Sequence, residues 1–308
     1  MIDVVLAAPR GFCAGVRRAI DAVRDALAVH GAPIFVRRAI VHNLEVVRDL
    51  EADGAIFVEE LDEVPPGGVV IFSAHGIAPA IAREARARGL VAYDAVCPLV
   101  SKVHREVERH QRDGRSIVMI GHAGHPEIAG TIGHVRAGTA FVVNSAAELA
   151  DLPIPADAPA AYAIQTTFAV DEAESIVAAL RARFANLIGP SSSDICYATT
   201  NRQTAVRALA AQVDAVIVAG ESFSSNAARL AEVAAAACGS VQLIANADQI
   251  DWGKLSGASS IGITAAASTP ECAVQAIVSA LGRRYRLRVS EYEAMRETTV
   301  FKRLAIAS

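Results

Sequence analysis

Three cysteines stand where an apolar, strand-like run gives way to a helical pattern. They are Cys13 in "APRGFCAGVRRAI", Cys97 in "DAVCPLVSKVH" and Cys196 in "SSSDICYATTNRQ". The residue after Cys97 is Pro98, which fits the first turn of a helix because its missing N–H would have no partner there. The partial positive charge of a helix N-terminus favours thiolate over thiol, and thiolate is the form that binds metals. Each joint therefore offers a thiolate with a fixed direction.

Three converging thiolates without a fourth cysteine in register would form a metal centre with one open position. Zinc and an iron–sulfur cluster both accept thiolates, and the residues leave that choice open. The wide spacing differs from the close pairs of structural zinc modules and from the clustered cysteines of ferredoxins. A cluster held by three cysteines leaves one iron free to act on a substrate. Cys238 and Cys272 lie in helical patterns, and we expect them to pack in the core.

Polar clusters that contain neither Lys nor Arg follow the other predicted strands. Histidines, hydroxyls and an amide in this arrangement suit a phosphate-type anion held by hydrogen bonds and helix N-termini. Bonds to a charged group contribute about 1.5–3 kcal/mol each, so several could hold a diphosphate. The candidate residues are His42, His75, His125, Ser224, Ser225, Asn226 and Ser268.

Glu127 is the carboxylate inside these clusters, two residues after His125 in "GHAGHPE". A glutamate that faces a reducible substrate, with the hydroxyl of Thr166 beside it, can relay protons. We therefore predict catalytic roles for Glu127 and Thr166.

The cysteines and polar clusters recur in register along three stretches of chain, each roughly 80–100 residues long, the size of a small domain. Strands alternate with helices over short connections, which predicts α/β units with parallel sheets. Ligands bind beyond the carboxyl ends of such strands, where these clusters fall. Helices are expected to close at Gly54, Gly138 and Gly239.

The predicted units are residues 1–96, 97–195 and 196–282, and residues 283–308 return to the first unit beside its N-terminal strand. The alternative is that strand ends are always polar and the clusters are ordinary turns.

Composition narrows the class of protein. Of the 308 residues 53% are hydrophobic, but the apolar runs are far shorter than the roughly 20 residues that span a bilayer. The net charge of −4 argues against a general nucleic-acid binder. Asp3 stands where a signal peptide would be positive, and five cysteines without close pairing do not form a disulfide framework. We expect a soluble cytoplasmic protein, a monomer or weak dimer, that binds neither nucleic acid nor membrane.

Seven segments resemble the signature segments of the 4-hydroxy-3-methylbut-2-enyl diphosphate reductase family, in the family's order. They are "PRGFCAGVRRAI", "VHN", "FSAHG", "DAVCPLVSKVH", "GHAGHPE", "QTTF" and "DICYATTNRQ". The resemblance implies a trefoil of three α/β domains around a central [4Fe–4S] cluster with Cys13, Cys97 and Cys196 as ligands.

The resemblance also implies a reaction, the last step of the methylerythritol phosphate route to isoprenoids. Two electrons and protons remove the hydroxyl of an allylic diphosphate as water, giving isopentenyl or dimethylallyl diphosphate. Glu127 would deliver protons, with Thr166 and His125 nearby. A ferredoxin or flavodoxin would supply the electrons. The residues that would bind the diphosphate are His42, His75, His125, Ser224, Ser225, Asn226 and Ser268.

The third stretch departs from the family pattern. Phe223 and Ala227 flank "SSN", and Ala266 stands where the family has glycine. If that position had a positive φ, alanine would cost about 1 kcal/mol and shift the loop that carries Ser268.

Two other functions remain open on the sequence. A cluster-bearing hydro-lyase also needs an open iron but performs no net reduction. A non-catalytic protein could use three cysteines and a histidine to hold structural zinc.

Overall fold

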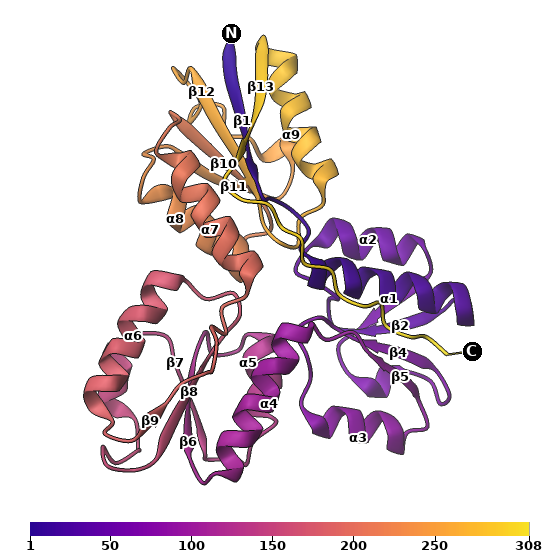
Figure 1. The fold of residues 1–308 in the computed structure, drawn as a ribbon. Helices are drawn as coiled ribbons and strands as arrows, with labels where there is room; N and C mark the ends of the chain where they lie inside the picture. Colours follow the sequence, from indigo (N-terminus) through magenta and orange to yellow (C-terminus); the bar gives the residue numbers. More distant parts are fainter. Residues whose placement is uncertain (308) are drawn as a thin grey trace. The chain divides into compact units, whose positions relative to one another are not determined.

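The structure, a computed structural model, describes residues 1–307 and contains three parallel β-sheets with helices packed against them (Figure 1). The prediction of three parallel-sheet α/β units is confirmed. The chain divides into two compact units. The first comprises residues 1–17, 42–46 and 197–300, and the second comprises residues 18–41, 47–196 and those from 301 onward.

The first unit holds sheet A, with strand order β11-β10-β12-β1-β13. Alternate side chains of β10 point to opposite faces: Val216 and Val218 pack with α7 and α8, whereas Ile217 packs on the α9 side. The elements are β1 (Ile2–Ala8), α7 (Tyr197–Ala210), β10 (Ala215–Ala219), α8 (Ser225–Ala235), β11 (Val241–Ile244), the 3-10 helix η3 (Ala247–Gln249), β12 (Ser260–Ala265), α9 (Glu271–Arg284) and β13 (Leu287–Glu293).

The second unit holds sheet B, with strand order β3-β2-β4-β5. Phe35, Val70 and Phe72 form a core with Ala85 of α3. Helices α1 and α2 begin in the first unit and continue in the second. The elements are α1 (Ala14–His30), β2 (Ile34–Arg37), α2 (Leu44–Ala52), β3 (Ala55–Val58), the 3-10 helix η1 (Leu61–Glu63), β4 (Val69–Phe72), α3 (Pro79–Ala87) and β5 (Val91–Asp94).

Sheet C also lies in the second unit, with strand order β7-β6-β8-β9. Along β6 the side chains alternate, so that Val118 and Ile120 pack with α6 while Ile117 packs with α4 and α5. The elements are α4 (Pro98–Arg112), β6 (Ser116–Ile120), α5 (Pro126–Ile132), β7 (Ala140–Val143), the 3-10 helix η2 (Ala147–Asp151), β8 (Ala160–Ile164), α6 (Val170–Arg183) and β9 (Leu187–Ile188).

The strands that precede the three cysteines pair in related ways, although β5 and β9 lie at the end of the strand order of their sheets and β1 has a further neighbour, β13. Strand β5 precedes Cys97 and pairs with β4, β9 precedes Cys196 and pairs with β8, and β1 precedes Cys13 and pairs with β12. In each case the cysteine N–H donates to a carbonyl just past the neighbouring strand. These acceptors are Ala267 O for Cys13 (3.2 Å), Ala74 O for Cys97 (3.0 Å) and Thr166 O for Cys196 (3.0 Å). The sequence repeat is therefore a structural repeat, and the sheets do not follow three consecutive segments because β1 joins β10–β13.

Two local expectations need correction. The apolar pattern of residues 33–43, "PIFVRRAIVHN", indicates a strand that runs through the whole stretch, but β2 ends at Arg37, and Arg38 has a φ of 59°. The helix expected to close at Gly138 is α5, which ends at Ile132 with Gly133 as its cap. Because α5 ends at Ile132, residues 133–139 form the turns that connect it to β7.

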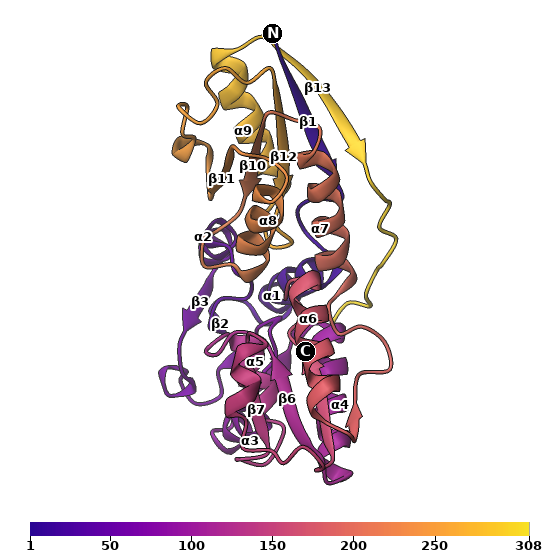
Figure 2. The same ribbon diagram turned by 90° about the vertical axis from the view of Figure 1, so that its left-hand side faces the viewer.

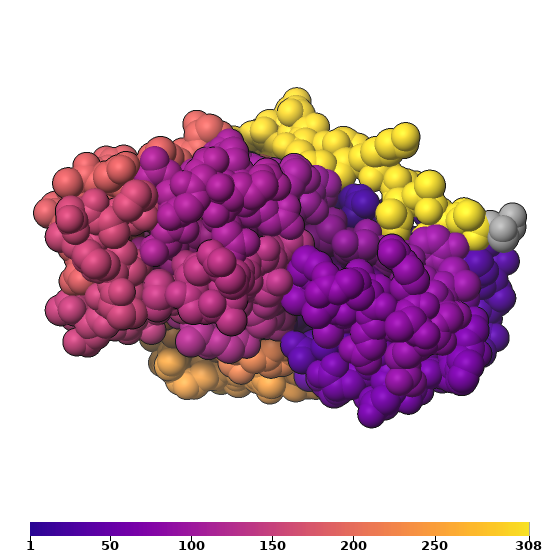
Figure 3. All heavy atoms as spheres, turned by 90° about the horizontal axis from the view of Figure 1, so that it is seen from below, coloured from indigo at the N-terminus to yellow at the C-terminus, as the bar shows by residue number. Residues whose placement is uncertain are grey.

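Residues 301–307 lie on the surface of the second unit (Figures 2 and 3). Arg303 pairs with Asp21 and Asp25 of α1 at 3.4 and 3.2 Å. The Tyr93 hydroxyl donates to the Ala307 carbonyl at 2.8 Å. The chain thus leaves sheet A after β13, which pairs with β1, and finishes against the second unit.

Within residues 1–307, no helix combines the length and apolar composition that crossing a membrane requires.

Leu180 tests the core of sheet C, since its side chain is fully buried on α6. We expect Leu180→Ala to lower the free energy of unfolding by about 2–5 kcal/mol, through lost burial and the cavity left behind. The control is Ile188→Ala, because Ile188 is 41% exposed and its loss should cost about 0.5 kcal/mol or less. Urea unfolding measures both, and equal losses would contradict this packing.

Candidate functional site

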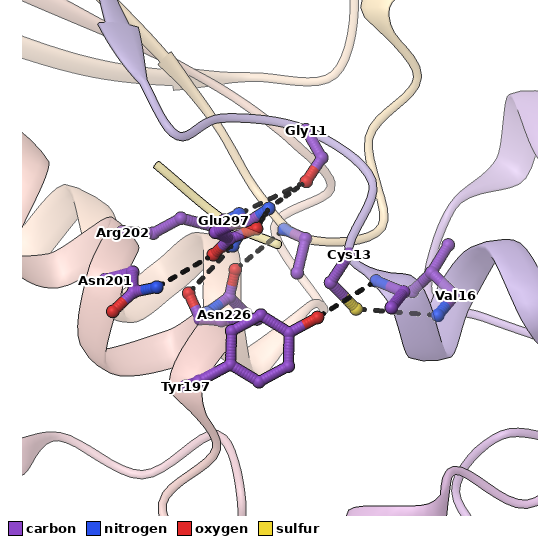
Figure 4. A network of polar contacts seen from close by, with 11 residues as sticks. Gly11, Cys13, Val16, Tyr197, Asn201, Arg202, Asn226 and Glu297 are labelled. Carbon is purple, nitrogen blue, oxygen red and sulfur yellow. Dashed lines mark hydrogen bonds and ion pairs between the residues drawn. The ribbon is translucent and has the colours of Figure 1, made fainter. Parts of the chain in front are cut away.

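The loop that carries Cys13 is fixed by backbone contacts within the first unit (Figure 4). Before the cysteine, the Gly11 N–H donates to the Ala265 carbonyl at 3.1 Å. After it, the Ala14 N–H donates to the Tyr197 hydroxyl at 3.2 Å. The Cys13 Sγ accepts the Val16 N–H at 3.5 Å, so the thiol lies at the N-terminus of α1 as predicted.

Predicted anion-binding residues of the first unit lie next to this loop. The Asn226 Oδ1 accepts the Ala267 N–H at 2.9 Å, and Ala267 is also the residue whose carbonyl binds the Cys13 N–H. The Ser268 hydroxyl donates to the His42 carbonyl at 3.1 Å. Hydrogen bonds through Ala267 and Ser268 therefore connect Cys13, Asn226 and His42.

His42 and the start of α8 complete this group. The His42 ring meets the Phe223 ring edge-on, with 6.1 Å between centroids. Burial lowers the pKa of His42, which favours the neutral imidazole. Ser224 caps α8 by accepting the Ala227 N–H at 3.5 Å, and Ser225 is the first residue of that helix.

The departures from the family pattern fit this packing. Ala266 is fully buried and lies outside the positive-φ region, because Arg38 is the non-glycine residue of the described chain with positive φ. The strain considered for Ala266 therefore does not arise. Any side chain at Gly220 would come within 2.7 Å of the Ala227 Cβ and 3.1 Å of the Ala266 Cβ, so these two alanines pack around a glycine.

Cys97 and His75 lie close together in the second unit. Cys97 is the N-cap residue of α4, and its N–H binds the carbonyl of Ala74. The His75 Nδ1 is hydrogen-bonded to the Ser73 hydroxyl at 3.3 Å. The His75 ring meets the His125 ring at right angles, with centroids 5.9 Å apart.

Glu127 and Thr166 form a buried pair in the same unit. The Glu127 Oε1 accepts the Thr166 N–H and its Oε2 accepts the Thr166 hydroxyl, both at 2.7 Å. Glu127 is 2% exposed. Burial raises the pKa of Glu127 to about 7, against the two Thr166 bonds, which lower it. This carboxyl can therefore both hold and release a proton near neutral pH.

The pair is joined to two other predicted residues. The Glu127 N–H donates to the His125 Nδ1 at 3.2 Å, and the Thr166 carbonyl accepts the Cys196 N–H. The structure therefore brings together His125, Glu127, Thr166 and the backbone of Cys196.

Sequence reasoning missed a partly buried ion pair beside Cys196, in which the Asp194 side chain is buried and that of Lys102 is partly exposed. The Lys102 Nζ of α4 donates to the carbonyls of Ser192 and Ser193 at 2.8 and 3.1 Å and to the Asp194 Oδ1 at 3.2 Å. The Asp194 Oδ2 accepts the Ile164 N–H at 3.0 Å. Helix α4, which begins after Cys97, is thereby bound to the segment that leads into Cys196. A lysine in a helix and an aspartate in a serine-rich loop carry no local signal of this contact.

Gly76, next to His75, has a φ of +80°, and a Cβ there would lie 2.5 Å from the Cε1 of His104. His104 is itself buried, and its ring stacks on His134 with centroids 4.1 Å apart. The His134 Nε2 is hydrogen-bonded to the Ile77 carbonyl at 3.0 Å. The loop that presents His75 is therefore packed tightly against α4.

Gly76→Ala tests this packing. A left-handed backbone costs an alanine about 1–2 kcal/mol, and the clash with the His104 ring adds about 1–3 kcal/mol. Gly89→Ala is the matched control, since Gly89 has a φ of +70° but open space around its Cα. We expect a larger drop in unfolding free energy for Gly76→Ala in urea titrations. Equal drops would mean that the loop moves aside without cost.

The remaining cysteines differ from each other. Cys238 is buried with the α7–α8 core, which confirms its packing role. The same expectation for Cys272 is wrong: it is exposed in the first turn of α9, with its Sγ 3.5 Å from a Glu45 carboxylate oxygen.

The side chains of Cys13, Cys97 and Cys196 are of intermediate exposure. Cys13 belongs to the first unit and the other two to the second. Among residues 1–307, no three His, Cys, Asp or Glu side chains form a group that could hold a metal ion.

Three parallel sheets covered by helices, cysteines at helix starts and a buried carboxyl whose pKa is raised to about 7 define an α/β protein equipped for redox or acid–base chemistry. The LytB protein family matches residues 4–282, and the chain belongs to this family.

Known relatives extend over nearly the whole chain. A 4-hydroxy-3-methylbut-2-enyl diphosphate reductase of Paracoccus denitrificans is 51% identical over 302 residues, covering 98% of this chain and 96% of that protein. The Bordetella pertussis protein of the same name is 50% identical over 299 residues, covering 97% and 92%. Such relatives identify the chain as an oxidoreductase.

Solved structures agree. The structure of the E-1-hydroxy-2-methyl-but-2-enyl-4-diphosphate reductase from Plasmodium falciparum matches with a TM-score of 0.92 and 36% identity, covering 98% of this chain and 96% of that one. A structure described as (E)-4-hydroxy-3-methyl-but-2-enyl diphosphate reductase, the terminal enzyme of the non-mevalonate pathway, matches with a TM-score of 0.66 and 30% identity, covering 92% and 100%.

Proposed function

We propose that the chain reduces (E)-4-hydroxy-3-methylbut-2-enyl diphosphate to isopentenyl diphosphate and dimethylallyl diphosphate. Two electrons and two protons enter, and the substrate hydroxyl leaves as water. The names of the relatives support the substrate. The observation on this chain that carries the proposal is the buried Glu127–Thr166 pair, because the reaction needs a proton source shielded from solvent.

Cys13, Cys97 and Cys196 would hold a [4Fe–4S] cluster. The chemistry of the donor set supports this: all three are thiols, and each immediately precedes a helix, where thiolate is favoured. The N–H bond to the Cys13 Sγ is of the kind that tunes iron–sulfur sites. When bound, the cluster supplies electrons and an iron with an open position for the hydroxyl.

Glu127 and Thr166 would move the protons. A threonine hydroxyl can donate or accept, so it can pass a proton to the Glu127 Oε2 and take one back by rotating. The backbone N–H of Thr166 fixes the Glu127 Oε1, which keeps the carboxyl in one orientation. With a pKa of about 7, Glu127 carries its proton in about half of the molecules at neutral pH.

The diphosphate would bind through hydrogen-bonding side chains. The residues proposed for this role are His42, His75, His125, Ser224, Ser225, Asn226 and Ser268. Bonds to the charged oxygens contribute about 1.5–3 kcal/mol each. The hydrogen bonds that link Asn226 and Ser268 to neighbouring backbone support their orientation before substrate arrives.

A separate redox protein, a ferredoxin or a flavodoxin, would deliver the electrons one at a time. The test is an anaerobic assay with the allylic diphosphate, with and without reduced flavodoxin. We expect both diphosphate products, and only when the reductant is present. Product formed without any electron donor would instead indicate a hydro-lyase.

A further inference from the structure

Arg202, on α7, is a fully buried cation outside the residues assigned above. All five of its N–H groups have acceptors, as Figure 4 shows in part. The Nε and Nη2 donate to the Gly11 carbonyl at 3.1 and 2.7 Å. The Nη1 donates to the Ala198 carbonyl at 3.0 Å and to the Glu297 Oε1 at 2.9 Å, and the Nη2 also reaches the Glu297 Oε2 at 3.4 Å.

The Gly11 carbonyl belongs to the short connection between β1 and α1 that carries Cys13. Gly11 has a φ of +65°, and a Cβ there would lie 3.1 Å from the Thr269 carbonyl oxygen. The backbone conformation at Gly11 is therefore special to glycine and closely packed. Its carbonyl direction decides where the chain goes over the next two residues, which end at Cys13.

Helix α7 makes hydrogen bonds to the β1–α1 connection at two points. Arg202 holds the Gly11 carbonyl before the cysteine, and the Tyr197 hydroxyl accepts the Ala14 N–H after it. The remaining anchors come from the end of β12, through the carbonyls of Ala265 and Ala267.

Only a guanidinium meets this set of acceptors. A lysine has three donors on a single nitrogen atom. It therefore cannot reach the Gly11 carbonyl, the Ala198 carbonyl and both Glu297 oxygens, which lie along different edges of the guanidinium. Glu297, from the segment after β13, supplies the counter-charge that a buried cation needs, and Asn201 donates to the same carboxylate at 3.1 Å.

We propose that Arg202, neutralised by Glu297, is the positioning residue of Cys13. It fixes the Gly11 carbonyl and thereby the direction in which the thiol is presented. This inference rests on the proposed function for Cys13 as a ligand. Arg202 touches neither substrate nor cluster, and it acts through the backbone.

The test measures the reactivity of Cys13 in the full-length chain, freed of iron by chelation under anaerobic, reducing conditions. Iodoacetamide labels the thiols, and peptide mass spectrometry follows Cys13 and Cys238. Cys238 is buried in the same unit, so it reports any general opening of that unit. The readout is the ratio of the two alkylation rates.

We expect Arg202→Met to change the Cys13 to Cys238 ratio at least fivefold, and Arg202→Lys to change it by less, in the same direction. Arg288→Met is the matched control, because it removes an exposed ion pair with Asp3 in the same unit and should leave the ratio within twofold. A ratio within twofold of wild type for Arg202→Met overturns the inference. Parallel acceleration of both thiols also overturns it, since Arg202 would then stabilise the whole unit.

Iron and sulfide content separates this inference from the function it rests on. Reconstituted wild type should hold the cluster, and Arg202→Met should lose its iron to a chelator at least fivefold faster. Wild type that never takes up iron and sulfide counts against the proposed function, and the alkylation ratio still decides the role of Arg202.

Discussion

Glu127→Gln lowers the turnover number by about a thousandfold and leaves the iron and sulfide content unchanged. The reason is that glutamine matches the shape of the carboxyl but carries no transferable proton, and general acid catalysis contributes about 10²–10⁴-fold. The Thr166 N–H and hydroxyl can still donate to the amide oxygen, so the fold should survive. Steady-state assays under anaerobic conditions measure the loss.

The pH dependence of turnover tests the role of Glu127 in a second way. The pKa of Glu127 is raised to about 7 by burial, so the protonated acid dominates below that pH and is lost above it. Turnover should therefore fall as the pH rises through 7, tending to about tenfold per pH unit. The free energy of unfolding should change in the same direction. A carboxyl whose pKa is raised in the folded protein contributes stability at low pH, and this contribution is lost as the pH rises through the pKa of the folded state.

Glu148→Gln is the control for Glu127→Gln. Glu148 lies in the same unit and accepts the Asn144 N–H at 2.9 Å, on the exterior and away from Thr166. It should keep wild-type turnover and pH profile. Full activity in Glu127→Gln, with its pH profile unchanged, would remove the proton-relay role.

Cys97→Ser should reduce bound iron and sulfide to a small fraction of the wild-type content and lower turnover by more than about a thousandfold. Iron–sulfur clusters are held by thiolates, and a serine hydroxyl is a poor replacement. Cys97 is only partly buried at the N-cap of α4, a position that serine favours. The unfolding midpoint should therefore stay close to that of wild type.

Cys272→Ser is the matched control, since Cys272 is an exposed thiol in the first turn of another helix. It should retain all its iron and full turnover. If Cys97→Ser kept a complete cluster, or if both variants lost iron alike, Cys97 would not be a specific ligand.

The strands and helices could be predicted because each depends on the pattern of residues within its own short segment. Runs such as "AVIVA" and "AYAI" are strand-length and apolar, and they became the buried strands β10 and β8. The neighbours of β1 could be predicted on one side only: the C-terminal segment was expected beside it, and β13 pairs with it. The pairing of β1 with β12 was not predicted, because Ser260 lies more than two hundred residues away in sequence and leaves no local signal at Asp3. The end of β2 was missed because "RRAIVHN" continues an apolar pattern through a turn that Arg38 makes with positive φ.

The residues of the candidate site also fall into those that the sequence indicated and those that it did not. Glu127 and Thr166 were paired from their places at the ends of neighbouring strands, and the structure puts them in contact. Arg202 was missed because a charged residue on a helix is most often a surface residue. Its burial depends on Gly11 and Glu297, both far away in sequence. Lys102 and Asp194 were missed for the same reason.

Iron and acid-labile sulfide on strictly anaerobic protein, with a Mössbauer spectrum before and after adding (E)-4-hydroxy-3-methylbut-2-enyl diphosphate, test the central claim most directly. The account predicts four irons and four sulfides per chain, with one iron site distinct from the others and altered by the diphosphate. Zinc in place of iron, or iron without sulfide even after anaerobic reconstitution, would contradict it.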